Sequence, residues 1–274
     1  VGLGLMGSSL AAALRGRRSD LQVLGVSRTE DNLREAAARG WINEGSPSLE
    51  EIVSRAQVVV LATPVRTICQ QVSEAAPFLP EGAVLTDVGS TKRAVLAVME
   101  SCQRAEACVG GHPMCGSERR GLEAADPHLY RGAYWAVCPS QHSTPEALSL
   151  VAGLASAVAA RPVLMMAEEH DAIVARTSHL PYAVSACLAR AVAGSVGDEE
   201  LHVLSAGGYR DTTRLAASDP SMMLDILMSN REHVLSGLTE MSRELEEFAE
   251  LLECGDEGSL QSYLERARAD RRMP

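Results

Sequence analysis

The sequence predicts an α/β protein in which a doubly wound, parallel sheet precedes an all-helical domain. Short apolar runs of strand length alternate with helical stretches up to about residue 166, whereas only helical patterns follow from residue 167 to residue 274. A length of 274 residues also suits two domains, since a domain usually has about 100 to 200 residues. We therefore expect one domain at 1–166 and a second at 167–274.

A glycine-rich motif opens the chain with the spacing G-x-G-x-x-G. A helical segment follows at once, then an apolar run at 21–26 and a polar helical stretch at 27–39. This β-α-β unit of about 30 residues is typical of a Rossmann-type sheet that binds a dinucleotide, where glycines let the backbone and a helix N-terminus approach the pyrophosphate. The candidate cofactor-binding residues are Gly2, Leu3, Gly4, Leu5, Met6 and Gly7.

The end of the second predicted strand indicates which dinucleotide binds. NAD-specific units usually have Asp or Glu there, but this chain has Ser27, Arg28 and Thr29. A carboxylate would repel a 2′-phosphate, whereas hydroxyl groups and a guanidinium would hold one. We therefore expect NADP as the preferred cofactor, with NAD possible. The alternative is that Arg28 is a solvated residue at the start of a helix.

The alternation of strands and helices continues through the first domain. The expected strands are 57–64, 83–90, 107–111, 134–138 and 163–166, and the expected helices are 65–78, 91–102 and 145–159. Ligands of such sheets bind beyond the carboxyl ends of the strands. The glycine motif, Thr63, Pro64, Ser90 and His112 all follow strand ends. The sequence therefore predicts one crevice there, with Thr63 and Pro64 as further cofactor contacts.

The sequence pattern predicts that the second domain consists of helices throughout. Residues 168–193 contain few helix breakers, the pair at 207–208 marks a bend, and 222–252 repeats apolar residues at steps of three, four and seven. That spacing predicts one long helix with a single apolar face. Because such a helix is long for a domain of this size, we expect it to pack against a second subunit in a homodimer. Packing within the domain is the alternative.

Composition limits the classes of partner. The net charge is −11, which argues against nucleic acid or an anionic membrane surface as a ligand. The seven cysteines form no C-x-x-C pair, and His170 with Asp171 lack a third ligand, so we expect no metal site. No apolar stretch is long enough to span a membrane, and no signal peptide opens the chain. These features predict a cytoplasmic protein.

Five motifs in a fixed order carry a resemblance to a known family. They are the glycine motif, Asp87-Val88-Gly89-Ser90-Thr91-Lys92, Gly111-His112-Pro113-Met114-Cys115-Gly116-Ser117-Glu118, Ser178-His179-Leu180-Pro181 and Gly208-Tyr209-Arg210-Asp211-Thr212-Thr213-Arg214. Together they resemble the prephenate/arogenate dehydrogenases of tyrosine biosynthesis. The resemblance implies oxidative decarboxylation of a cyclohexadienol, prephenate or arogenate, with hydride transfer to NADP or NAD.

The same resemblance implies roles for individual residues. His112 matches the catalytic histidine, which accepts the proton of the substrate hydroxyl, and Ser90 is a hydroxyl partner that orients His112 or the substrate. Arg214 matches the arginine that binds a substrate carboxylate. Arg210 is a candidate supporting cation, and Asp211 is a candidate to orient it. The alternative for these three residues is a capping loop with ordinary surface charges.

Three further positions are candidates, and two of them have two interpretations each. His179 lines the cleft or is a hydrogen-bonded residue of the core, and Glu118 selects substrate or supplies a charge at a helix N-terminus. Tyr182 stands where many prephenate-using relatives have His, so it is a candidate contact to the substrate side chain. Together with the NADP signature, Tyr182 makes arogenate a candidate substrate. The choice between prephenate and arogenate stays open.

Two other functions remain as alternatives. Other two-domain hydroxy-acid dehydrogenases generally use a Lys on the first long helix of the second domain, and 168–200 contains none. A dimer that senses the dinucleotide without catalysis would bind NADP but would not need Ser90, His112 or Arg214 for its function. Enzymatic assay separates this second alternative from a dehydrogenase.

Overall fold

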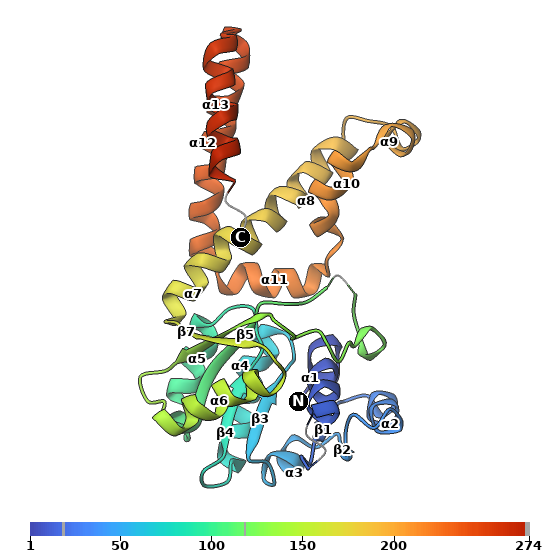
Figure 1. The fold of residues 1–274 in the computed structure, drawn as a ribbon, viewed down its shortest axis with the longest axis vertical. Coiled ribbons are helices and arrows are strands. Elements are labelled where there is room, and N and C mark those ends of the chain that lie inside the picture. The colour runs from blue at the N-terminus through green and yellow to red at the C-terminus, as the bar shows by residue number, and fades with distance from the viewer. Residues whose placement is uncertain (18–19, 118, 272–274) are drawn as a thin grey trace.

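The structure is a computed structural model, and it describes residues 1–17, 20–117 and 119–271 (Figure 1). The N-terminal part has strands covered by helices, and the C-terminal part is helical, which confirms the predicted fold class (Figure 1). The strands are β1 (Leu24–Val26), β2 (Glu44–Ser46), β3 (Val58–Leu61), β4 (Val84–Asp87), β5 (Cys108–Pro113), β6 (Tyr134–Pro139) and β7 (Arg161–Leu164). The helices around them are α1 (Leu5–Arg17), α2 (Glu30–Ala38), α3 (Leu49–Val53), α4 (Val65–Ala75), α5 (Arg93–Ser101) and α6 (Pro145–Ala157).

The main sheet has the strand order β3-β4-β5-β6-β7, and β1 pairs with β2 in a separate, parallel pair. Val1 and Gly2 connect the two, because the backbone nitrogen of Val1 donates to the carbonyl oxygen of Val60 at 2.7 Å and Gly2 N–H donates to the carbonyl oxygen of Val26 at 2.9 Å. The sheet is mostly parallel, as predicted, and departs from the prediction at one pair, since β5 and β6 are antiparallel. Parallel neighbours need a crossover, usually a helix. The described part of 114–133 supplies only a short 3-10 turn.

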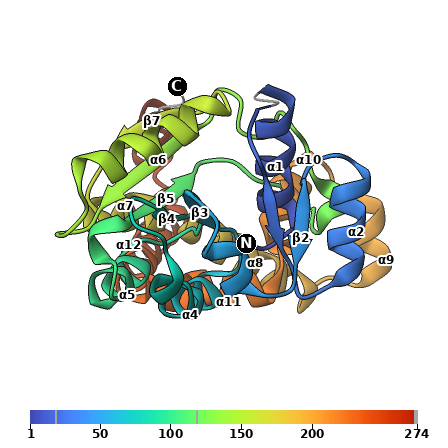
Figure 2. The same cartoon turned by 90° about the horizontal axis from the view of Figure 1, so that it is seen from below.

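Helices cover both faces of the main sheet, as a doubly wound sheet requires. Alternate residues of β6 point to opposite faces: Ala136 and Cys138 belong to the apolar cluster under α4 and α5, whereas Trp135 and Val137 belong to the cluster under α1 and α6. Figure 2 shows α6 on one side of β4 and β5, with α4 and α5 on the other side. The sheet is thus buried on both faces, and its strand ends are left to form a site.

The helical part begins with α7 (Ala167–Val174), a π-helical turn (Ala175–His179) and α8 (Leu180–Ala193). It continues with α9 (Asp198–Leu204), α10 (Gly207–Thr213), a 3-10 turn (Arg214–Ala217), α11 (Pro220–Ser229), α12 (Arg231–Cys254) and α13 (Glu257–Asp270). Figure 1 shows α12 and α13 side by side, projecting away from the sheet. None of the helices described is long and apolar enough to cross a membrane.

The single helix predicted over 222–252 is wrong, because Asn230 divides it into α11 and α12. The backbone of Asn230 leaves the helical region, with φ −122° and ψ 30°. Its buried side chain donates from Nδ2 to the carbonyl oxygen of Asp171 at 2.7 Å. The apolar spacing continues through the break, so the pattern alone does not reveal it. This bend brings α11 over the strand ends of the main sheet (Figure 1).

Candidate active site

A cleft of about 380 Å³ lies between the strand ends and α11. Its walls include Gly4 to Met6, Thr63 with Pro64, Ser90 and His112, and the helical part contributes Met222 and Ile226. These are the four segments that the sequence predicts to meet at one crevice, so that convergence is confirmed. Helix α11 was not expected there, and it closes the cleft on the side of the helical domain.

The glycine motif has the geometry needed to hold a pyrophosphate. Gly2 has φ +89°, which side chains disfavour, and a Cβ on Gly7 would collide with the carbonyl oxygen of Gly2. By contrast, a Cβ on Gly4 would meet no atom within 4 Å, so open space lies beside the first turn of α1. The unpaired N–H groups of a helix N-terminus favour an anion. These residues therefore fit a nicotinamide dinucleotide.

Ser27, Arg28 and Thr29 follow β1 and lie next to the glycine motif, because Gly2 bonds to the last residue of β1. Arg28 is exposed, and Thr29 N–H donates to Ser27 Oγ at 3.2 Å. The three residues do not line the 380 Å³ cleft itself. They stand at the edge where a dinucleotide on this motif would place its ribose.

A buried ion pair lies behind the strand ends that line the cleft. Lys92 Nζ donates to the carboxylate of Asp87 and, at 2.7 Å, to the carbonyl oxygen of Gly111. Asp87 accepts in addition from the N–H groups of Gly89 at 2.8 Å and Gly111 at 3.0 Å. The pair thus joins the ends of β4 and β5 directly before Ser90 and His112. Sequence reasoning assigned no role to Asp87 or Lys92, although both stand in one of the quoted motifs.

His112 is linked to the helical domain through a second histidine. Its Nδ1 lies 2.8 Å from Nε2 of His170, and the two rings meet edge to face with centroids 5.0 Å apart. Burial, together with the nearby His170 and Lys92, holds the pKa of His112 well below its usual value. His112 is therefore neutral at physiological pH. A neutral imidazole on a cleft wall is able to accept a proton.

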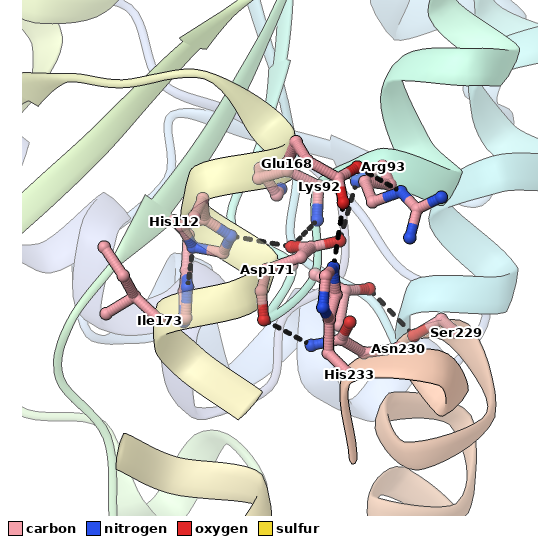
Figure 3. A network of polar contacts seen from close by, with 12 residues as sticks. Lys92, Arg93, His112, Glu168, Asp171, Ile173, Ser229, Asn230 and His233 are labelled. Carbon is pink, nitrogen blue, oxygen red and sulfur yellow. Dashed lines mark hydrogen bonds and ion pairs between the residues drawn. The ribbon is translucent and has the colours of Figure 1, made fainter. Parts of the chain in front are cut away.

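Asp171 lies at the centre of this network (Figure 3). Its carboxylate accepts from Nδ1 of His170 at 2.7 Å and from the N–H groups of Lys92 and Arg93, at 2.8 and 2.9 Å, where α5 begins. Burial raises the pKa of Asp171, but the bonds from His170, Arg93 and Lys92 outweigh it and lower the pKa below its usual value. The carboxylate is therefore ionised, and it fixes α7 to α5.

The structure places His179 and Tyr182 away from the walls of the cleft. His179 is buried, and its Nδ1 lies 3.2 Å from Nδ2 of Asn230. Burial lowers the pKa of His179 to about 4, so its ring is neutral. Tyr182 is half-buried and packs against the apolar cluster that includes Ile226. Glu118 lies outside the described residues.

Arg210, Asp211 and Arg214 lie in α10 and the 3-10 turn after it, where all three are exposed. None of them belongs to the walls of the cleft as the structure describes it. The turn packs on α8, with Ala216 N–H donating to Ser185 Oγ at 3.0 Å. In this chain the motif that carries Arg214 is therefore not brought to the cleft.

Two arginines that sequence reasoning missed do line the cleft. Arg119 and Arg120 follow the turn at Gly116 and Ser117, just after the strand that carries His112. Arg120 pairs with Asp219 at 2.5 Å, and Asp219 in turn caps the N-terminus of α11. Their sequence signal is two adjacent cations a few residues beyond a strand end. This ion pair links the two domains across the cleft.

Fold and site together define a class of protein. A glycine loop at a helix N-terminus, beside a neutral histidine at the end of a neighbouring strand, is the arrangement of an oxidoreductase that uses a nicotinamide dinucleotide. Two family models match the chain: "Prephenate dehydrogenase, nucleotide-binding domain" over residues 10–164, and "Prephenate dehydrogenase, dimerization domain" over residues 166–266. The chain belongs to the prephenate/arogenate dehydrogenase family and is an NAD(P)-dependent oxidoreductase.

Individual relatives agree with this family. The chain is 32% identical over 273 residues to prephenate dehydrogenase of Bacillus subtilis, covering 97% of this chain and 73% of that protein. It is 30% identical to cyclohexadienyl dehydrogenase of Zymomonas mobilis, covering 89% and 84%. The relatives thus carry the names of enzymes with different substrate ranges, and identity alone does not choose among them.

Solved structures show the same architecture. The crystal structure of prephenate dehydrogenase from Aquifex aeolicus, in complex with hydroxyphenyl propionate and NAD+, has a TM-score of 0.92 and 30% identity, covering 98% of this chain and 95% of that one. Arogenate dehydrogenase of Synechocystis has a TM-score of 0.84 and 29% identity, covering 98% and 96%. The cleft therefore belongs to a small-molecule dehydrogenase.

Proposed function

We propose that this enzyme oxidises prephenate or arogenate, prefers NADP, and uses His112 as its base with Ser90 as a hydroxyl partner. The observation that supports the proposal most strongly is the neutral His112 on the cleft wall, beside the glycine loop, with Nδ1 engaged by His170. The remaining ring nitrogen, Nε2, is then available to a substrate. The enzymes named among the relatives act on this class of substrate.

The proposed chemistry needs one proton acceptor. The glycine loop at residues 2–7 would hold the dinucleotide, which would supply the acceptor for the hydride of the hydroxyl-bearing ring carbon. His112 takes the hydroxyl proton at Nε2, and Ser90 orients this hydroxyl by a hydrogen bond. The ring carboxylate leaves as CO₂, its bonding electrons complete the aromatic ring, and His112 returns the proton to the phenolic oxygen. Charge and atoms balance without a further reactant.

The substrate carboxylates need cations in a chain of net charge −11. The family resemblance favours Arg214, with Arg210 as a supporting cation that Asp211 orients, whereas the geometry of the cleft favours Arg119 and Arg120. Replacing each of Arg214 and Arg120 by Ala separates these candidates. The residue that binds a carboxylate is the one whose loss raises the substrate KM.

Substrate choice and the positions around it complete the proposal. Tyr182 in place of a histidine supports arogenate over prephenate. We also propose that His179 and Glu118 affect the substrate pocket, His179 through the packing of the π-helical turn. Comparing kcat/KM for the two substrates in wild type and Tyr182→His tests this choice. The substitution is expected to shift the ratio towards prephenate.

The preference for NADP is supported by Ser27, Arg28 and Thr29 at the end of β1. Asp31, just beyond them, is paired with Arg34 at 2.9 Å, which reduces its repulsion of a phosphate. Arg28→Ala is expected to raise the KM for NADP and to leave the KM for NAD unchanged. An equal change for both cofactors would remove the argument for the phosphate.

A homodimer is the proposed assembly. We assign residues 1–166 to the nucleotide-binding domain and 167–274 to the helical domain for substrate binding and dimerisation, since β7 ends at Leu164 and α7 begins at Ala167. Exposed leucines along α11 and α12 support a subunit interface: Leu224, Leu235, Leu245 and Leu252. The described cysteines are free thiols, which suits the cytoplasm. Light scattering of the purified chain measures the assembly.

The deciding experiment assays both substrates with both cofactors. Wild-type protein is expected to form NADPH only when a cyclohexadienol is present, with NADP better than NAD. No turnover with either substrate, despite measured dinucleotide binding, would favour a dinucleotide sensor. Turnover of a simple hydroxy acid would favour the other dehydrogenase class.

A further inference from the structure

Three buried or half-buried side chains, Asp171, His170 and His112, form one continuous chain of hydrogen bonds from α7 to the cleft. We propose that Asp171 and His170 are positioning residues that fix the tautomer of His112, so that its Nε2 carries no hydrogen before substrate binds. This inference rests on the proposed role of His112 as the base. It assigns a function to a pair that is not among the described residues lining the cleft.

The direction of these hydrogen bonds follows from the carboxylate at one end of the series. An ionised carboxylate only accepts hydrogen bonds, so Nδ1 of His170, at 2.7 Å, carries the hydrogen. If His170 carries this single hydrogen, its other nitrogen, Nε2, is an acceptor. Nδ1 of His112, at 2.8 Å from it, must donate. Neutral His112 then has its lone pair on Nε2, which is the nitrogen left for the cleft.

The reverse direction is blocked at Asp171. With a single hydrogen on His170, the hydrogen bonds could run the other way only if Asp171 donated a hydrogen to Nδ1 of His170. The same carboxylate already accepts from the backbone N–H groups of Lys92 and Arg93 at the start of α5, and these hold both of its oxygens. Three donors face one carboxylate, and the pKa of Asp171 is lowered accordingly. Asp171 therefore has no hydrogen to donate.

The surroundings of His112 contain no competing partner for Nδ1 among the described residues. The other ionisable groups near its ring are Lys92 and His179. Lys92 is engaged by Asp87 and Gly111, and His179 by Asn230. A free imidazole has access to both tautomers, and the wrong one places a hydrogen where the base must accept. His170 removes this choice.

Three substitutions of His170 separate positioning from packing. Asparagine places its amide near the position of Nδ1, so His170→Asn can still donate to Asp171 but offers nothing to His112. His170→Phe keeps the ring and removes both contacts. Glutamine places its amide near the position of Nε2, so His170→Gln can still accept from His112. Only an effect on the tautomer predicts that Gln restores what Asn and Phe lose.

The test is nitrogen NMR of the labelled imidazole rings together with the pH profile of kcat. Wild type is expected to show His112 with hydrogen on Nδ1 alone. In His170→Asn and His170→Phe, His112 should populate the other tautomer, and kcat should fall about 10- to 100-fold, as for other partners that orient a functional histidine. His170→Gln should recover most of kcat. The Kd for NADP should stay unchanged in all three variants.

His112→Asn is the reference that keeps two failures distinct. If His112→Asn retains full activity, the proposed base is wrong. If His112→Asn is inactive, but His170→Asn and His170→Phe keep the wild-type tautomer and kcat, then the proposed function stands and the positioning role is wrong. A fall in kcat that His170→Gln fails to recover, with an unchanged tautomer, would also overturn the positioning role.

Discussion

Two ion pairs of similar chemistry occupy opposite settings in this molecule. Lys92 and Asp87 lie under the cleft with both side chains 0% exposed, whereas Arg176 and Glu240 join the π-helical turn to α12 with side chains 53% and 45% exposed. Both pairs are in direct contact. Contact between two charges therefore does not indicate how much the pair stabilises the fold, because solvent already satisfies the exposed pair but nothing replaces a lost partner of the buried pair.

The buried pair also has a geometric task that the exposed pair lacks. Lys92 and Asp87 bind the backbone of Gly111, one residue before His112, and Asp87 binds Gly89, one residue before Ser90. The pair thus sets the positions of both proposed catalytic groups. The exposed pair lowers the pKa of Glu240 to about 2 through the Arg176 guanidinium, yet it positions no residue of the cleft.

The largest loss of stability is expected when one charge of the buried pair is removed. Lys92→Met leaves the carboxylate of Asp87 unpaired in the interior, which costs about 3–5 kcal/mol of the free energy of unfolding. Urea unfolding followed by circular dichroism measures the loss. Lys92→Met combined with Asp87→Asn should recover part of it, because no isolated charge then remains. A single variant as stable as wild type would contradict the account.

A second prediction concerns pH and the buried His179. Its pKa is about 4 in the folded protein, against about 6.5 for an ordinary histidine. As the pH falls below 6.5, His179 binds a proton in the unfolded chain but stays neutral in the folded chain. The free energy of unfolding therefore falls until about pH 4. The loss is on the order of 3 kcal/mol.

His179→Gln isolates this contribution, because glutamine does not titrate and the loss of the contact to Asn230 does not depend on pH. The stability difference between wild type and His179→Gln, measured by urea unfolding, is expected to shift against wild type from pH 7 to pH 4.5. Other groups titrate in both proteins and cancel. A difference that does not depend on pH would mean that His179 is not held neutral by burial.

The smallest effect is expected at the exposed pair. Glu240→Gln removes one charge, and solvent compensates for the lost ion pair. The melting temperature, measured by differential scanning fluorimetry, should stay close to that of wild type, and kcat should not change. Arg176→Gln serves as the matched control. A loss comparable to that of Lys92→Met would remove the distinction between the two settings.

Sequence patterns predict most of the fold because the apolar repeat of a strand or a helix involves only residues that are close together in the sequence. They fail where a tertiary contact decides: Asn230 breaks a continuous apolar pattern because its buried amide bonds to Asp171, and β6 runs antiparallel because a loop replaces a crossover helix. The short β2 and α3 have too few residues to show a period.

The candidate site likewise has a part that the sequence predicts and a part that it does not. The segments at strand ends were predictable, since topology alone brings them together. The bond between His112 and His170 joins positions 58 residues apart, and no spacing rule reveals it. His170 and Asp171 attract attention in the sequence only as incomplete metal ligands. Arg119 and Arg120 enter the cleft through the path of a loop, which the sequence does not specify.

The central claim is that His112, held neutral above the buried pair, is the base of a cyclohexadienol dehydrogenase. Its most direct test is a single-turnover experiment in which wild type and His112→Asn, each saturated with NADP, are mixed with prephenate or arogenate. We predict rapid formation of NADPH by wild type, and a rate about 10²- to 10⁴-fold lower for His112→Asn with cofactor binding unchanged. Equal rates for the two proteins would contradict the claim.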